Sequence, residues 1–119
     1  MESGIFTIDI FKDLNYKGRI ALAESTKNPE ILILLSEDSN EYVRGQVVQN
    51  TNTPIYILIK MLEEYDNLSW SKKTESYKKG YRKENIEKTL NLIKREIGKS
   101  EFAKIKRIHE ILYSGKNFI

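Results

Sequence analysis

The sequence predicts an all-α fold, a short α-solenoid that is closed by a C-terminal helical hairpin. Three observations lead to this prediction: an apolar sequence segment that nearly repeats, a proline at the start of each copy, and two amphipathic stripes in the C-terminal half. A solenoid stacks units that bury their apolar faces only against a neighbouring unit. Such an architecture presents surfaces for binding and by itself implies no chemistry.

The repeat shows most clearly in two prolines and two arginines. Arg19 precedes Pro29 by ten residues, and Arg44 precedes Pro54 by the same distance. Both pairs are 25 residues apart, since 54 − 29 and 44 − 19 each give 25. Each proline stands at the start of a run rich in Ile and Leu. A period of roughly 20 to 50 residues is typical of stacked helical units.

Helix signals divide residues 1–67 into an N-terminal cap (1–15) and two helical repeats (16–67). Residues 5–14 begin with strand-like alternation but continue at helical spacing, which favours a capping helix. Further helices are predicted over residues 16–24, after Asn28 as N-cap, over 41–49 after a capping turn at 38–40, and after Pro54. The side chains predicted to face inward are Ile20, Ala23, Ile31, Leu32, Leu35, Val43, Val47, Val48, Ile57, Leu58, Met61 and Leu62.

The repeat pattern breaks after Asn67. Residues 68–83 form a basic connection that is mobile or partly helical, with Trp70 at the place of Val43 and an interruption at Gly80. Residues 84–119 predict a helical hairpin and a tail, with Gly98 ending the first helix and Ser100 capping the second. Residues 117–119, which end in two apolar side chains, suit a tail that folds back on the body. The inward stripes are Ile86, Leu90, Ile93 and Ile97, then Phe102, Ile105, Ile108 and Leu112.

Residues 43–54, followed by paired aliphatic residues, resemble the leucine-rich repeat variant, a relative of HEAT-like helical repeats. Units of that family have about two dozen residues, with a short helix, an Asn-rich turn ending in Thr-Pro, a second helix and an acidic turn. The match covers about residues 17–67 and is looser in the first unit, at residues 25–29. The resemblance implies a right-handed stack of HEAT-like repeats, a binding role and no catalytic residues. The iron–sulfur cluster beside some such repeats needs cysteines, which this chain lacks.

Composition limits the class of protein. At 119 residues, with 39% hydrophobic and 31% charged residues, the chain suits one soluble domain over residues 1–119. The absence of cysteine excludes disulfides and thiolate metal sites, and it is compatible with a reducing compartment. No run approaches the roughly 18 apolar residues that a membrane span needs, and the N-terminus lacks the features of a signal peptide. We therefore expect a cytoplasmic protein with no membrane association and no cofactor.

Charge is distributed unevenly between the two halves. Residues 1–67 hold 6 Lys/Arg and 11 Asp/Glu, which gives −5, and residues 68–119 hold 14 and 6, which gives +8. The sum is the overall net charge of +3. Such asymmetry indicates a surface for an anionic partner, or simply polar helices that carry many lysines.

The basic connection supplies the candidate binding residues. Its cations suit phosphates or an acidic surface, and its aromatic rings suit stacking on bases. The alternative is that the rings pack against the repeats while the lysines remain solvated. The candidates, for a partner or for nucleic acid, are Trp70, Lys72, Lys73, Tyr77, Lys78, Lys79, Tyr81 and Arg82.

Other polar residues favour structural roles. His109, the only histidine, lies at the border of an apolar stripe, and one histidine without cysteine makes no credible metal site. Arg19 and Arg44, at equivalent positions, predict a polar ladder between units. A helix-turn-helix over residues 90–107 is an alternative for the hairpin, but its second helix is strongly apolar. Acidic residues at the turns suit capping and ion pairs with these arginines: Glu37, Asp38, Glu41, Glu63, Glu64 and Asp66.

These observations favour a non-enzymatic helical-repeat module that binds a protein partner, and its size suits a small adaptor or inhibitor. The alternative is a nucleic-acid-binding helical repeat protein that uses the basic C-terminal half. An enzyme is disfavoured, because no acidic residue is paired with an aromatic cleft. Nothing in the sequence specifies an oligomeric state or a pathway.

Overall fold

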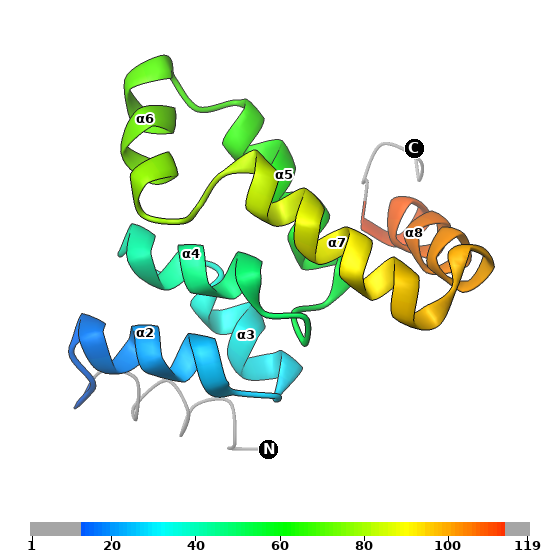
Figure 1. Ribbon diagram of the computed structural model, residues 1–119, viewed down its shortest axis with the longest axis horizontal. Helices are drawn as coiled ribbons and strands as arrows, with labels where there is room; N and C mark the ends of the chain where they lie inside the picture. Colours follow the sequence, from blue (N-terminus) through cyan, green and yellow to red (C-terminus); the bar gives the residue numbers. More distant parts are fainter. Residues whose placement is uncertain (1–12, 114–119) are drawn as a thin grey trace.

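The computed structural model describes residues 13–113. Within this range the only regular secondary structure is seven α-helices, so the all-α prediction is confirmed there (Figure 1). The predicted capping helix lies almost wholly outside the described residues, as does the tail at 117–119. The helices are α2 (Tyr16–Ser25), α3 (Pro29–Leu35), α4 (Glu41–Gln49), α5 (Ile55–Asp66), α6 (Trp70–Lys78), α7 (Lys83–Ile97) and α8 (Lys99–Tyr113).

The N-termini of α3, α4 and α5 lie where the sequence predicts them. Asn28 accepts a hydrogen bond from the backbone N–H of Glu30 at 2.9 Å. Asn40 accepts one from the N–H of Tyr42 at 2.8 Å, so both asparagines act as N-caps. At α5, Pro54 is the N-cap residue and makes no side-chain cap. These caps satisfy backbone donors that have no partner within the helix.

Helix α4 lies at the centre of the arrangement, between α2 and α7 (Figure 1). Helix α3 packs against α2 and α4, while α5 packs against α7 and α8, and α7 packs against α8. Helix α6 lies apart from this body at the upper left of the view, and its near neighbour is α4. The predicted basic connection is thus mainly a helix.

The core lies between these helices and contains most of the side chains that the sequence assigns to it. Leu58 is fully buried and Met61 is 1% exposed, and Tyr81 of the connection joins them. The core side chains are Ala23, Leu32, Leu35, Val43, Val47, Val48, Ile55, Ile57, Leu58, Met61, Tyr65, Tyr81, Ile86 and Ile93. Ile20, Ile31, Leu62, Leu90 and Phe102 pack against this core and are partly buried.

The inward prediction is wrong for four residues of the hairpin. Ile97, Ile105, Ile108 and Leu112 are 37%, 41%, 54% and 57% exposed. Helix α8 is the last described helix and packs on α5 and α7, so among the described residues no further helix covers its other side. Periodicity identifies an apolar stripe but not whether a neighbour covers it.

Two local predictions also need correction. Trp70 does not take the buried place of Val43, because Ser69 caps α6 and Trp70 is its first residue, with Ser76 facing α4 instead. Ser100 is not the cap of the last helix. Gly98 has φ +95° and reverses the chain by itself, so α8 already begins at Lys99, and the N–H of Phe102 donates to the Gly98 carbonyl.

Polar contacts join α2 and α4 through the turn at residues 36–40. The Arg19 guanidinium donates to the Asp38 carboxylate at 2.7 and 3.2 Å, and Arg44 donates to the backbone carbonyl of Asp38. Both arginines therefore contact one residue through different atoms, and a ladder of repeated contacts stays a prediction. The buried Asn50 side chain donates to the carbonyls of Ala23 and Thr26, at 2.8 and 2.9 Å.

A backbone contact holds α4 against the turn that follows α6. A Cβ atom on Gly45 would lie 2.2 Å from the carbonyl oxygen of Lys79, so only glycine fits this close approach. Gly80, at φ +89°, ends α6 in a Schellman motif: its own N–H donates to Tyr77, and that of Tyr81 donates to Ser76.

Replacing Gly45 with Ala should lower the free energy of unfolding by about 1–3 kcal/mol, because the methyl group forces backbone apart. Alanine at an unconstrained helix position would instead stabilise the protein by up to about 1 kcal/mol. Gly18→Ala in α2 is the matched control, since the nearest atoms to its Cβ belong to side chains, with Leu14 Cδ2 at 3.2 Å, and not to backbone. Urea unfolding of the wild type, Gly45→Ala and Gly18→Ala measures whether each substitution lowers or raises the free energy of unfolding.

Replacing Leu58 with Ala should cost on the order of 2–5 kcal/mol, because it opens a cavity at a fully buried position. Lys60→Ala on the same helix removes an exposed ion pair with Glu37 and should cost less than about 1 kcal/mol. Chemical denaturation measures both. A loss below about 1 kcal/mol for Leu58→Ala would contradict the packing described for α5.

Candidate interaction surface

Helix α6 has a polar inner side and aromatic residues on its outer side. Its only buried residue is Ser76, which is fully buried and faces α4. Trp70, at the opposite extreme, is 81% exposed. An amphipathic helix normally buries its large apolar side chains and exposes its polar ones. The residues that anchor α6 are therefore different from the residues that form its exposed surface.

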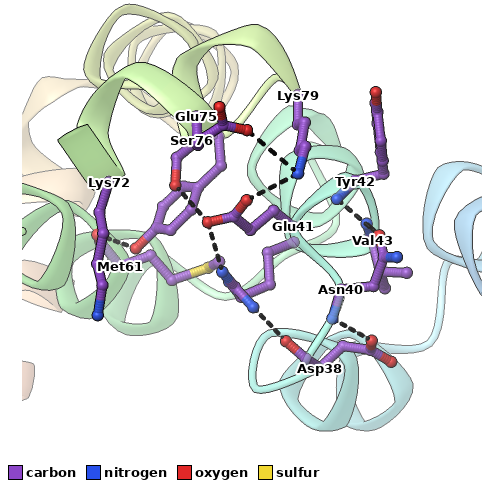
Figure 2. A network of polar contacts seen from close by, with 12 residues as sticks. Asp38, Asn40, Glu41, Tyr42, Val43, Met61, Lys72, Glu75, Ser76 and Lys79 are labelled. Carbon is purple, nitrogen blue, oxygen red and sulfur yellow. Dashed lines mark hydrogen bonds and ion pairs between the residues drawn. The ribbon is translucent and has the colours of Figure 1, made fainter.

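The anchor is a carboxylate on α4. Glu41 accepts hydrogen bonds from Ser76 Oγ at 3.0 Å and from Lys79 Nζ at 3.2 Å (Figure 2). Arg44 lies 3.6 Å from the same carboxylate, and Lys79 also lies 3.6 Å from Glu75. Ser76 and Lys79 therefore fix α6 to a carboxylate of α4, while Arg44 and Glu75 form ion pairs within their own segments.

The charges around Glu41 set its protonation. Partial burial by itself would raise the pKa of the Glu41 carboxyl, but the hydrogen bonds from Ser76 and Lys79 and the nearby cations outweigh it, so the pKa is lowered. The same hydrogen bond raises the pKa of Lys79. Both groups are therefore charged at neutral pH.

Tyr81 follows the Gly80 turn and belongs to the core. Its hydroxyl donates to the Met61 carbonyl at 2.8 Å, and its ring lies 5.6 Å from that of Tyr65, edge to face. The Arg44 guanidinium lies 5.5 Å above the same ring. Burial raises the pKa of the Tyr81 hydroxyl. Tyr81 is therefore a packing residue and leaves no surface for a partner.

One side of α6, together with the residue that caps α7, carries a stripe of alternating rings and cations. Trp70 and Tyr77 are seven residues apart, so they lie on one face of the helix, two turns from each other. The Arg82 guanidinium stacks 4.6 Å from the Tyr77 ring centroid, and Lys73 Nζ lies 5.9 Å from that of Tyr65. We call Trp70, Lys73, Tyr77 and Arg82 the α6 stripe.

The eight predicted binding residues thus divide into three groups. The structure brings Trp70, Lys73, Tyr77 and Arg82 together. Lys72 and Lys78 are exposed but do not belong to this stripe. The helical spacing puts Lys72 on another side of α6. Lys79 is engaged by Glu41, and Tyr81 is buried.

A second surface lies at the other end of the molecule. An apolar groove of about 460 Å³ runs between the start of α5 and helices α7 and α8, lined in part by Pro54, Ile97 and Leu112. His109 also borders this groove and is half-buried, with its ring centroid 5.2 Å from that of Tyr56. Burial lowers the pKa of His109.

Residues 13–113 meet the requirements of neither a metal site nor a membrane-spanning helix. Among residues 13–113, no cluster of three or more acidic or histidine side chains is arranged to hold a metal. None of the helices in this range combines the length and apolarity that a membrane crossing requires. The connection between α7 and α8 is the single residue Gly98, shorter than the roughly three- to four-residue turn of a helix-turn-helix.

Comparison with protein-family models, curated proteins and solved structures finds no match for this chain. The resemblance to the leucine-rich repeat variant therefore stays a prediction. The function has to be argued from the surface itself.

Sequence reasoning missed the residues that fix α6. Gly45 in the interior of a predicted helix was the available signal, because glycine costs about 1 kcal/mol there and suggests a close contact. Ser76 gave no comparable signal, since small polar residues are common on exposed helices. Glu41 was assigned to capping and ion pairs, and its ion pair with Arg44 is present.

Replacing Glu41 with Gln should destabilise the protein at pH 7, because Lys79 and Arg44 lose their carboxylate. The folded pKa of Glu41 lies below its unfolded value of about 4.5. Its stabilising effect is therefore complete above that pH and disappears as the pH falls through the folded pKa. Urea unfolding should show that the difference between the two proteins becomes smaller as the pH falls below about 4.5.

Glu75→Gln is the matched control for this prediction. Glu75 is more exposed and shares only the ion pair with Lys79, so its replacement should have little effect at any pH. A Glu41→Gln difference that stayed constant over the whole acid range in which the protein remains folded would show that the carboxylate charge is not what anchors α6.

Proposed function

We propose that this protein is a non-enzymatic helical-repeat module that binds a protein partner through the α6 stripe. Its size suits an adaptor or a small inhibitor. The observation that carries the proposal is Trp70, which is 81% exposed on a helix that contributes little to the core. Tryptophan is highly buried on average in folded proteins and is enriched among the residues that dominate protein interfaces.

The anchoring of α6 supports a binding role. Glu41 and the Gly45 contact hold the helix in place, and Arg82 stacks on the Tyr77 ring. A surface that is ordered before it binds loses less conformational entropy on association. The stripe therefore has large rings, adjacent cations and a fixed backbone.

The repeat part of the proposal has separate support. Helix α4 packs between α2 and α7, and Arg19 and Arg44 each donate to a backbone carbonyl a few residues before their own helix, those of Leu14 and Asp38. Contacts that recur between successive units are typical of helical repeats. Under this proposal, α6 is an additional helix that projects from the stack before α7.

Nucleic-acid binding is the second candidate function, because the stripe combines exposed rings with cations. It predicts that affinity falls steeply with salt, since each neutralised phosphate releases counterions. Two predicted contributors are engaged elsewhere, because Lys79 pairs with Glu41 and Tyr81 is buried.

Trp70→Ala should abolish or strongly weaken capture of a partner by the full chain from extracts of its host. Lys72→Ala, on another side of α6, should leave capture nearly unchanged. Recovered protein is quantified by mass spectrometry, with nuclease treatment of the extract. Trp70 is exposed, so its replacement should leave the unfolding midpoint unchanged, which thermal unfolding checks.

Two results would contradict the proposal. In the first, the wild type binds random-sequence DNA or RNA tightly at physiological salt. Replacing Lys72, Lys73, Lys78 and Lys79 with Ala then reduces both affinity and salt dependence more than Trp70→Ala does. In the second, Trp70→Ala captures the same protein as strongly as the wild type.

A further inference from the structure

The α6 stripe carries cations that have no carboxylate of their own. Within residues 13–113, no ion pair joins Lys72, Lys73, Lys78 or Arg82 to an acidic side chain. The single acidic residue between Trp70 and Arg82 is Glu75, which pairs with Lys79. The stripe therefore carries positive charge, and its two large rings are those of Trp70 and Tyr77.

The rings also orient these cations. The Arg82 guanidinium carbon lies over the Tyr77 ring, 4.6 Å from its centroid, and Nη1 donates to the Tyr77 carbonyl at 3.5 Å. A guanidinium held against a ring keeps its remaining N–H donors available for a planar acceptor such as a carboxylate. Lys73, above the Tyr65 ring, provides a second cation nearer to Trp70 on the same stripe.

We propose that the occupant of the α6 stripe is an acidic protein segment that packs an apolar side chain against Trp70 and sets carboxylates against Lys73 and Arg82. This inference rests on the proposed function and adds the chemistry of the partner. Trp70 and Tyr77 are separated by seven residues, or about 10 Å along the helix. A segment of roughly a dozen residues is long enough to cover that distance in either helical or extended form.

The geometry favours a protein over nucleic acid for this occupant. Single-stranded nucleic acid is bound by successive rings with free faces along a continuous basic groove. Here Arg82 already covers one face of Tyr77, Tyr81 is buried, and Glu41 neutralises Lys79. One open ring, Trp70, remains with cations to one side of it, which matches one apolar side chain with acidic residues to one side of it.

Trp70 is the only tryptophan, so its fluorescence reports directly on this surface. Random twelve-residue peptides displayed on phage are selected against the full chain, and the enriched peptides are synthesised. We expect them to be rich in Asp and Glu around an aromatic or aliphatic residue, and to shift the Trp70 emission to the blue. Amide replacement of their acids should weaken binding by at least about 10-fold.

Variants locate the binding. Arg82→Gln should weaken the selected peptides by about 10-fold and Arg82→Lys by less, because lysine keeps the charge but loses the planar donors. Lys72→Ala, the control, should change affinity by less than about 3-fold. Equal effects of Arg82→Gln and Lys72→Ala would overturn the assignment of Arg82.

The remaining outcomes separate this inference from the proposed function. Neutral or basic peptides that bind the wild type but not Trp70→Ala would overturn the acidic partner and leave the protein-binding function standing. Absence of any peptide that requires Trp70 would overturn both. A random single-stranded DNA that shifts Trp70 emission at physiological salt, and binds more tightly than every selected peptide, would also overturn both.

Discussion

The close approach of α4 to the turn at residues 79–81 is the constraint on which the rest of the arrangement depends. Because Gly45 has no side chain, the backbone of Lys79 and Gly80 lies directly against the helix. This contact sets where α6 ends and where α7 begins. Tyr81 can then reach the Met61 carbonyl in the core. The C-terminal helices are thereby joined to α4 by backbone contact as well as by apolar packing.

The same contact explains why α6 can present its aromatic side to solvent. A helix held by apolar burial must turn its large side chains inward. Helix α6 is held instead by Glu41, Ser76 and the glycine contact, which leaves Trp70 and Tyr77 outside. Apolar side chains usually lie inside a protein and polar ones outside, and departures from this distribution are found at binding surfaces. Anchor and surface lie on different sides of one short helix, so each can be altered with little direct effect on the other.

Local sequence signals were sufficient for the starts of α3, α4 and α5. Asn28 with Pro29 and Asn40 mark helix starts by capping chemistry that involves only neighbouring residues, and Pro54 marks the start of α5 through its fixed backbone angle. The bounds of α4 and the burial of Leu58 follow from these signals together with the period of the apolar residues. The shared contact with Asp38 was not predictable in this way, because Arg19 binds its carboxylate from 19 residues away and Arg44 binds its backbone carbonyl from six residues away.

The sequence by itself determined that the described chain is helical, where α2 to α5 begin, and that residues 68–83 concentrate cations and rings. Only the tertiary structure decided which of those residues share a surface. Tyr81 and Tyr77 are alike in sequence, yet one is buried beneath Arg44 and the other is exposed under Arg82. The stripe of α8 is likewise apolar in sequence, but Ile108 and Leu112 remain exposed. The reason is physical: periodicity and capping are properties of one segment, whereas burial depends on which distant segments lie against it.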